Sequence, residues 1–157
     1  MITSEDIRLA NFGDAKRIAE MSRMFIEHGL GWSWTPKRVR KEMASKSGNV
    51  IVAVEGGKVI GFGIMSYGEG EARLNLFAVD PDYRRKGVGT RLVQWLEKTV
   101  LVNGSGVVYL EARSENTGAI KFYESVGYRV VQSISRYYGG REAAVRMAHD
   151  LWSAPPQ

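Results

Sequence analysis

The chain has no cysteine among its 157 residues, which excludes disulfide bonds, thiolate nucleophiles and zinc sites with thiolate ligands. Histidine is scarce too, since His28 and His149 are the only two and stand too far apart to indicate a metal site. No apolar run approaches the ~20 residues that a membrane-spanning helix needs. The N-terminus lacks the basic and apolar regions of a secretory signal peptide, so we expect a cytoplasmic protein. From the missing cysteines and the isolated histidines we expect no metal.

Length and charge set the next limits. We expect one domain over residues 1–152, followed by a frayed tail at 153–157. A hydrophobic content of 44% and a charged content of 25% are typical of soluble globular domains. The formal net charge of +5 fits an anionic ligand, and it would also attract RNA. Because the basic residues are scattered and no aromatic RNA-binding signature accompanies them, nucleic acid is not an expected partner.

The most informative stretch begins where an apolar run ends at Val79 and is stopped by Pro81. A basic run at 84–86 follows, then two glycines at 87 and 89, and a helical period begins at Thr90. The free N–H groups of such a helix N-terminus suit a phosphate or pyrophosphate. The alternative is an ordinary glycine-rich helix start. The third glycine of a dinucleotide fingerprint and the Gly-Lys-Ser/Thr of a P-loop are both missing.

Hydrophobic periodicity and turn residues predict the element order β-α-α-β-β-β-α-β-α-β-β. The predicted strands are 6–10, 49–55, 58–67, 72–79, 107–113, 128–138 and 143–151, and the predicted helices are 15–26, 36–47, 90–100 and 116–126. A meander in the first half and a β-α-β crossover in the second give an α/β (α+β) fold. Its sheet is mixed, with helices on both faces.

Two motifs resemble those of the GNAT superfamily of N-acetyltransferases. The spacing Arg84-x-x-Gly87-x-Gly89 after a strand resembles the acetyl-CoA motif of that family. The stretch 110–128 resembles the second family signature, in which a strand and an asparagine precede a helix with Ala-x-x-x-Tyr-Glu and then Gly-Tyr. The two motifs occur in the family order and at a family-like separation.

The C-terminal region resembles the ribosomal-protein-alanine (protein N-terminal) acetyltransferase branch, through residues 135–138 and 141–147. Ala143 stands where that branch usually has an acid. The resemblance covers roughly residues 50–150 well and the first 48 weakly. It implies a GNAT-like, mostly antiparallel twisted sheet of about seven strands with about four helices on both faces. It also implies acetyl-CoA as co-substrate.

The resemblance also implies which residues contact the cofactor. The strand end would pair with the pantetheine arm, the loop amides would hold the pyrophosphate, and the basic side chains would reach phosphates or stay solvated. The residues so assigned are Phe77, Ala78, Val79, Arg84, Arg85, Lys86, Gly87, Val88, Gly89, Thr90, Asn116 and Tyr123. Asn116 would bind the pantetheine arm, and it also suits a plain helix N-cap.

Acetyl transfer to an amine needs a base for the amine and a proton for the departing thiolate. Glu111 is the candidate base, because a carboxylate in an otherwise apolar strand is costly unless it is paired or functional. It also matches the base of the family branch, and the alternative is an ion pair with Arg113 or another cation. Tyr123 is the candidate acid, since it matches the family tyrosine near the sulfur; the alternative is a core tyrosine. Without cysteine, we expect direct transfer in a ternary complex.

The acceptor side is less determined by the sequence. Trp32 and Trp34, and the pair Tyr137 and Tyr138, would contact the substrate or simply pack the loop and the strand that carry them. We predict an N-acetyltransferase that acts on a primary amine, with a protein N-terminal α-amine slightly favoured. The alternatives are a small-molecule amine (polyamine, amino acid or antibiotic) and a non-catalytic acyl-CoA-binding sensor domain. The sequence leaves a monomer and a homodimer equally open.

Overall fold

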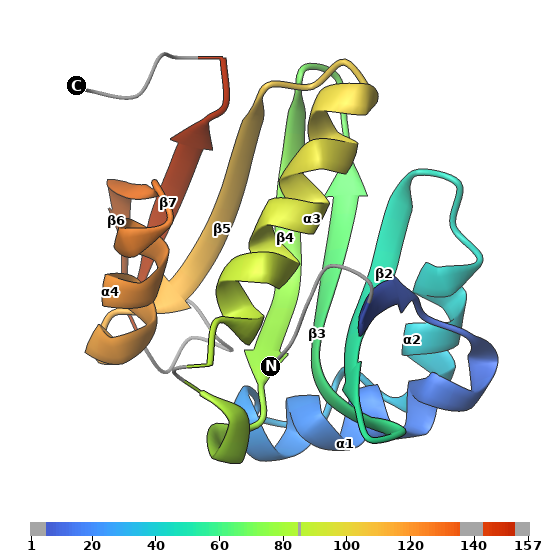
Figure 1. Ribbon diagram of the computed structural model, residues 1–157. Coiled ribbons are helices and arrows are strands. Elements are labelled where there is room, and N and C mark those ends of the chain that lie inside the picture. The colour runs from blue at the N-terminus through green and yellow to red at the C-terminus, as the bar shows by residue number, and fades with distance from the viewer. Residues whose placement is uncertain (1–5, 85, 136–142, 153–157) are drawn as a thin grey trace.

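The computed structural model describes residues 6–84, 86–135 and 143–152. Seven strands form one sheet in the order β1-β2-β3-β4-β5-β7-β6 (Figure 1). The strands are β1 (Ile7–Leu9), β2 (Gly48–Glu55), β3 (Lys58–Tyr67), β4 (Glu71–Val79), β5 (Val107–Arg113), β6 (Arg129–Ile134) and β7 (Ala144–Asp150). The helices are α1 (Ala15–Phe25), α2 (Pro36–Met43), α3 (Val88–Val102) and α4 (Thr117–Ser125), with short 3-10 turns η2 (Phe12–Asp14) and η3 (Pro81–Tyr83).

The predicted fold class and element order are confirmed. β1 to β4 pair antiparallel as a meander, β4 and β5 pair parallel across the α3 crossover, and β7 pairs antiparallel with β5 and β6. The boundaries differ in places: α3 begins at Val88 instead of Thr90, and α2 ends at Met43. The second half of the strand predicted at 128–138 and the tail at 153–157 lie largely or wholly outside the described residues.

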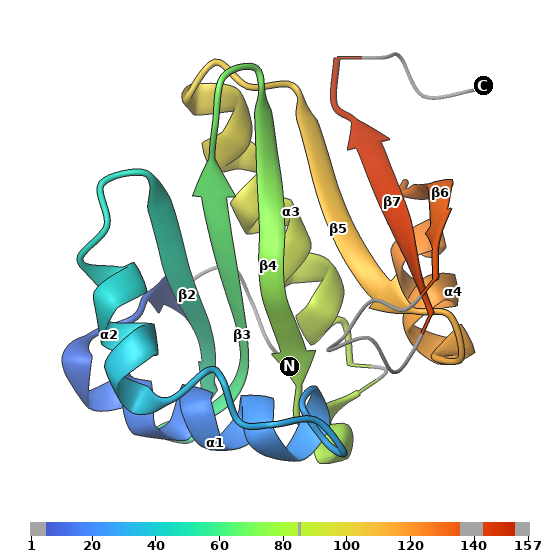
Figure 2. The same ribbon diagram turned by 180° about the vertical axis from the view of Figure 1, so that it is seen from behind.

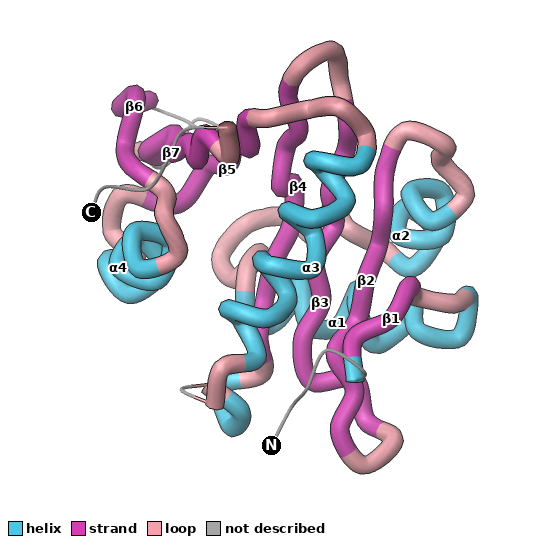
Figure 3. Tube along the Cα trace, turned by 45° about the horizontal axis from the view of Figure 1, so that its top comes forward, coloured by secondary structure: helices cyan, strands magenta, loops and turns pink. Residues whose placement is uncertain are grey.

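Helices cover both faces of the sheet, but not evenly. α3 and α4 pack on one face, as two separate cyan coils in Figure 3, over a core that includes Leu92, Leu96 and Leu110. On the other face α1 packs against β3 and β4 and α2 against β2, around Ile18 and Phe62. Figure 2 shows that β5 and β7 carry no helix on this second face. None of the helices in the described part of the chain is long and apolar enough to span a membrane.

Two glycines of β3 set the position of α3. A Cβ atom on Gly63 would lie 2.8 Å from Cδ1 of Leu96, and one on Gly61 would lie 3.0 Å from Cδ1 of Leu92. Both distances are shorter than a normal carbon contact, so side chains here would push the helix off the sheet. Their absence lets α3 lie directly on β3, with its N-terminus beside the end of β4.

β4 contains a β-bulge close to the point where this strand separates from β5. Met65 pairs with Leu74 and Ile64 pairs with Leu76, so Asn75 is an extra residue in β4. The faces therefore invert along the strand: Leu74 belongs to the core under α3 and α4, whereas Leu76 belongs to the core under α1 and α2.

Beyond the bulge the two central strands separate. β4 and β5 pair only through Glu71–Val107, Ala72–Val108 and Arg73–Tyr109. Further along they diverge, as Figure 1 shows between the labels β4 and β5. The remaining residues, 74–79 of β4 and 110–113 of β5, bound what we call the β4–β5 opening.

Candidate active site

The β4 side of the opening presents a strand edge. β3 pairs with one edge of β4 as far as Val79, but β5 leaves the other edge after Arg73. The backbone groups of residues 74–79 that face β5 therefore have no strand partner among the described residues. An extended ligand that carries amides could pair with this edge, apart from the Val79 carbonyl, which accepts Arg84 Nε. The side chain of Phe77 stacks on Phe122 of α4 with ring centroids 5.7 Å apart, which closes the α4 side of this edge.

The start of α3 lies at the end of that strand edge. Gly87 is the N-cap with φ of 80°, a left-handed conformation that favours glycine, and Arg91 N–H makes the first helical bond to its carbonyl at 3.1 Å. The amides of Val88, Gly89 and Thr90 belong to the first turn, where no intrahelical acceptor exists. With the positive end of the helix dipole, they provide the N–H donors that the predicted anion site requires.

Gly89 has a role that sequence reasoning missed. A Cβ atom there would lie 3.0 Å from Cζ of Phe122, so the missing side chain lets α4 approach the start of α3. The interpretation from sequence assigned this glycine to close contact with a ligand. Phe122 stands directly before Tyr123, the predicted acid. This aromatic side chain was the signal in the sequence for a contact between α3 and α4.

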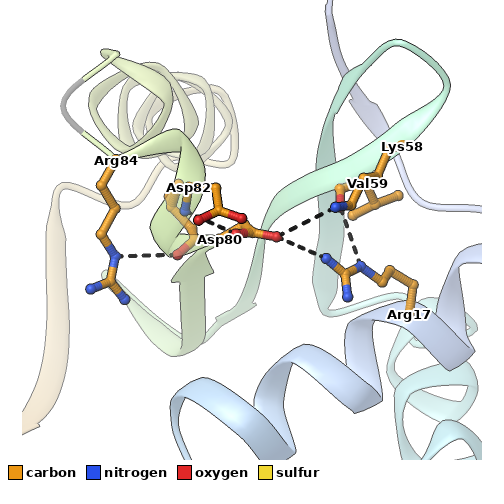
Figure 4. A network of polar contacts seen from close by, with 7 residues as sticks. Arg17, Lys58, Val59, Asp80, Asp82 and Arg84 are labelled. Carbon is orange, nitrogen blue, oxygen red and sulfur yellow. Dashed lines mark hydrogen bonds and ion pairs between the residues drawn. The ribbon is translucent and has the colours of Figure 1, made fainter.

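Asp80 anchors the loop between β4 and α3, and Figure 4 shows its contacts. Its Oδ1 accepts the Asp82 N–H at 3.0 Å and so caps η3, while its Oδ2 pairs with Arg17 Nη2 at 3.0 Å and Lys58 Nζ at 3.8 Å. Arg17 of α1 also donates to the Val59 carbonyl at 3.4 Å. The loop is thus tied to α1 and to the β2–β3 hairpin. The sequence pointed to this residue only as the end of a strand.

The basic residues of the loop lie close to their own segment. Arg84 Nε donates to the Val79 carbonyl at 3.4 Å, and Lys86 Nζ lies 5.4 Å from the centre of the Tyr83 ring. Both are exposed and near the start of α3, as a phosphate-binding role requires. Arg85 lies outside the described residues.

Glu111 lies in the middle of β5 on the face opposite α3 and α4, since its neighbours Leu110 and Ala112 pack in the core on that side. Its side chain is only 6% exposed. Oε1 pairs with Arg73 of β4, and Oε2 accepts Nε of Arg146 of β7 at 3.0 Å. An ion-paired carboxylate was one predicted alternative, and both of these partners stand on neighbouring strands.

Arg113, the cation named from the sequence as a partner for Glu111, has a further task. Its Nη2 donates to the carbonyls of Ile26 at 2.8 Å and His28 at 3.2 Å. The end of β5 therefore holds the loop that follows α1, so this loop borders the side of the opening where Glu111 lies.

Tyr123 comes from α4, on the opposite side of the opening. It is 9% exposed, and its ring contacts Phe77 at 6.0 Å, Phe122 at 5.4 Å and Tyr128 at 5.9 Å between centroids. Asn116 Oδ1 accepts the Ala119 N–H at 3.1 Å, which is the N-cap arrangement expected as its alternative role. The packing of Tyr123 is that of a core residue, and such packing also fixes where its hydroxyl group lies.

The neighbouring Tyr128 is a different kind of tyrosine. Burial, together with the nearby carboxylate of Glu97, raises the pKa of Tyr128 far above its ordinary value. Its hydroxyl group donates to Glu97 Oε2 at 3.1 Å, and His149 Nδ1 lies 2.7 Å from the same oxygen. This cluster joins α3 to β7 behind Tyr123 and holds α4 in place.

The two predicted tryptophans occupy unlike positions. Trp32 is 38% exposed, and its Nε1 donates to the Ala19 carbonyl at 3.2 Å. Trp34 is 8% exposed and packs in the core under α1 and α2, with the Arg38 guanidinium 3.8 Å from its ring centre. This favours packing for Trp34 and leaves Trp32 as the substrate-contact candidate. Tyr137 and Tyr138 lie outside the described residues.

A buried carboxylate shapes the loop that carries these tryptophans. Glu27 accepts the N–H and hydroxyl of Ser33 at 2.7 and 2.6 Å, the Trp34 N–H, and the Ser22 hydroxyl at 2.8 Å. Burial alone would raise the pKa of Glu27, but these hydrogen bonds outweigh it and hold that pKa below its ordinary value. Sequence reasoning passed over this residue.

A groove of about 430 Å³ lies over β4, β5, β6 and β7, next to the two arginines that pair with Glu111. It is lined by Glu71, Ala72, Arg73, Tyr109, Val131, Gln132 and Arg146. Two of these residues are the arginines that bind Glu111. The groove is therefore bordered by the partners of Glu111, on the face of β5 opposite α3 and α4.

Comparison with known proteins agrees with this geometry. RimI of Mycobacterium tuberculosis, an N-alpha-acetyltransferase, is 35% identical over 130 residues, which cover 80% of this chain and 78% of the relative. The ribosomal protein bS18-alanine N-acetyltransferase of Escherichia coli K12 is 35% identical over 127 residues, 77% of this chain and 82% of the relative. The crystal structure of the Escherichia coli ribosomal-protein-S18-alanine enzyme matches with a TM-score of 0.78 at 29% identity, covering 100% of this chain and 98% of the other.

The strongest assignment comes from the family level. The family model described as the acetyltransferase (GNAT) family matches residues 17–128, which include the whole β4–β5 opening, the start of α3 and the helix that carries Tyr123. The chain belongs to the acetyltransferase (GNAT) family.

Proposed function

We propose that this acetyltransferase moves the acetyl group of acetyl-CoA to the N-terminal α-amine of a protein, in a ternary complex and in the cytoplasm. The observation that carries the proposal is the β4–β5 opening, which brings together a free strand edge, a helix N-terminus, Glu111 and Tyr123. Two relatives at 35% identity are named for acetylation of protein α-amines, which favours this acceptor over a small molecule.

The residues present fit acetyl-CoA. The pantetheine arm carries amides, and the edge of β4 at Phe77–Val79, which β5 leaves unpaired, offers them backbone hydrogen-bond partners. The amides of the first turn of α3 suit the pyrophosphate, and Arg84 and Lys86 supply positive charge near it. Asn116, at the start of α4, would bind the arm while it caps its helix.

The chemistry then divides between the two sides of the opening. The neutral amine attacks the thioester carbonyl, a C–N bond forms, the C–S bond breaks, and coenzyme A leaves as a thiolate. Glu111 accepts the proton that the amine loses, and Tyr123 gives a proton to the thiolate. Holding both reactants in one site supplies much of the barrier reduction, up to ~7–11 kcal/mol in ideal cases.

The test measures free thiol release from acetyl-CoA with a panel of amines. The panel holds peptides with different N-termini, the same peptides with blocked N-termini, polyamines, amino acids and aminoglycosides. We expect turnover on free peptide N-termini, none on the blocked peptides, and loss of turnover in Glu111→Gln and Tyr123→Phe. Turnover confined to a small-molecule amine would overturn the acceptor. Tight acetyl-CoA binding without turnover on any member would favour the sensor alternative.

A further inference from the structure

Glu111 stands at the point where β4 and β5 separate. The last pair between these strands is Arg73 with Tyr109, and Glu111 follows two residues later on the same face of β5. Arg73 therefore reaches Glu111 along a diagonal across the diverging strands. Arg146 lies directly opposite Glu111 in the β5–β7 register. The carboxylate is thus held between guanidinium groups from both neighbouring strands.

The three side chains differ in how much water reaches them. The Glu111 side chain is 6% exposed, whereas those of Arg73 and Arg146 are 44% and 33% exposed and line the groove. A carboxylate buried to this extent is costly without partners, so the arginines stabilise its charged form. Arg146 is oriented in turn, because its Nη1 donates to Gln132 Oε1 of β6 at 3.0 Å.

The two arginines contact both oxygens of the carboxylate. Arg73 contacts Oε1 and Arg146 Nε contacts Oε2, so the guanidinium groups fix the plane of the carboxylate.

We propose that Arg73 and Arg146 are positioning residues for the reaction: they fix the Glu111 carboxylate at the edge of the opening and keep it ionised. The inference rests on the proposed function in taking Glu111 as the base. It goes beyond that function by assigning a task to two arginines outside the family motifs, one on each neighbouring strand.

The charged and titratable groups that face this carboxylate come from several elements. Arg73 and Glu71 lie on β4, Tyr109 and Arg113 on the same face of β5, and Arg146 on β7. Within this described set the cations outnumber the other acid, Glu71, which is exposed at the margin of the groove. Removing one arginine takes a cation away from the carboxylate, so Glu111 should then bind its proton at a higher pH.

The first experiment reads this coupling without any acceptor. The carboxyl carbons of glutamate are labelled with ¹³C, the Glu111 signal is assigned by its loss in Glu111→Gln, and its titration midpoint is compared across variants. We expect a higher midpoint in Arg146→Gln and Arg73→Gln, and the wild-type midpoint in Arg146→Lys within about half a pH unit. Arg129→Gln on the exposed β6 edge is the matched control and should leave the midpoint unchanged.

The second experiment reads positioning from the kinetics. It is run near pH 9, because an acceptor α-amine titrates near 7.7–8.0 and would otherwise dominate the profile. We expect kcat to fall about 10-fold in Arg146→Gln, partial recovery in Arg146→Lys, and an unchanged KM for acetyl-CoA. Thermal unfolding of each variant separates this loss from poor folding.

The two experiments distinguish failure of the positioning role from failure of the proposed function. Unchanged midpoints in both glutamine variants, or shifted midpoints with unchanged kcat, would overturn the positioning role. A wild-type enzyme silent on every acceptor but with shifted midpoints would count against the proposed function, while the coupling of the arginines to Glu111 would stand.

Discussion

Two buried carboxylates lie at opposite sides of the β4–β5 opening and have different kinds of partners. Asp80 and Glu111 have side chains 9% and 6% exposed, and each pairs with two cations. Asp80 also accepts a backbone N–H, and its cations come from α1 and the β2–β3 hairpin. The cations of Glu111 come from strands beside a groove. The carboxylate of Asp80 therefore fixes the backbone of a loop, whereas that of Glu111 links three neighbouring strands.

The sharpest test of this difference is Glu111→Gln. We expect kcat to fall by about 10²–10⁴-fold, because the amide cannot accept the proton of the amine. The Kd of acetyl-CoA should stay within a few-fold, since Glu111 lies on the face away from α3 and α4. Thiol release measures the first quantity and calorimetry the second. Glu115→Gln, an exposed acid before α4, is the matched control; a loss below 10-fold in Glu111→Gln would remove its assigned role.

Asp80→Ala should instead affect mainly the stability of the fold, with a smaller effect on the reaction. It leaves Arg17 without its buried partner and removes the cap of η3, at a cost of about 2–4 kcal/mol in the free energy of unfolding. Urea unfolding measures this cost. We also expect a higher KM for acetyl-CoA, since the loop before α3 loses its anchor. Asp82→Ala keeps the capping N–H and should cost far less; equal losses would mean that the carboxylate of Asp80 is not the anchor.

Glu27 is a third buried carboxylate to compare with Asp80 and Glu111. The donors described around it are hydroxyl and amide groups instead of cations. We expect Glu27→Gln to cost about 1–2 kcal/mol at pH 7, as the amide cannot accept all the hydrogen bonds. The pKa of Glu27 is lower in the folded state, so its stabilisation is present above the unfolded value near 4.3 and is lost as pH falls through the folded pKa.

The measurement is the difference in unfolding free energy between wild type and Glu27→Gln as a function of pH. This difference should be constant above about pH 5 and shrink below about 4.3. Glu20→Gln, an exposed position on α1, should show no such trend. A difference that grows on acidification would contradict the direction assigned to the pKa.

The smallest effect is expected at the ion pair of Arg8 and Asp14. Arg8 Nη1 lies 2.7 Å from Asp14 Oδ2, but the Arg8 side chain is 44% exposed. The pKa of Asp14 is lowered overall: burial would raise it, but the hydrogen bonds from Arg8 and from the Asn11 N–H outweigh that. We expect Arg8→Gln to cost about 0.5 kcal/mol, and less in high salt, because the Asn11 bond at 2.8 Å persists. A loss above 2 kcal/mol in urea unfolding would break the proposed ranking of these carboxylates.

Much of the fold could be predicted from the sequence because its signals are local. Glycine turns, capping residues and hydrophobic periods gave the element order, and the start of α3 was displaced only because Gly87 supplies a left-handed cap. Glu111 and Tyr123 were indicated by resemblance to family motifs. The catalytic roles of these two residues remain predictions. The partners of Glu111 could not be predicted, since Arg73 and Arg146 meet it only through the register of three strands. The burial of Trp34 likewise depends on Glu27 and on the packing of two helices.

Because Asn75 is an extra residue in β4, the alternation of side chains between the two faces of the sheet shifts by one position along this strand. Before Asn75, residues of one parity face α3 and α4, and after it the other parity does. Deleting Asn75 would therefore keep every other side chain yet exchange the surroundings of Phe77 and Ala78. The aromatic contact to α4 would turn away from the opening. At this position the length of the chain matters as much as its chemistry, so related sequences should tolerate substitutions here more readily than insertions or deletions.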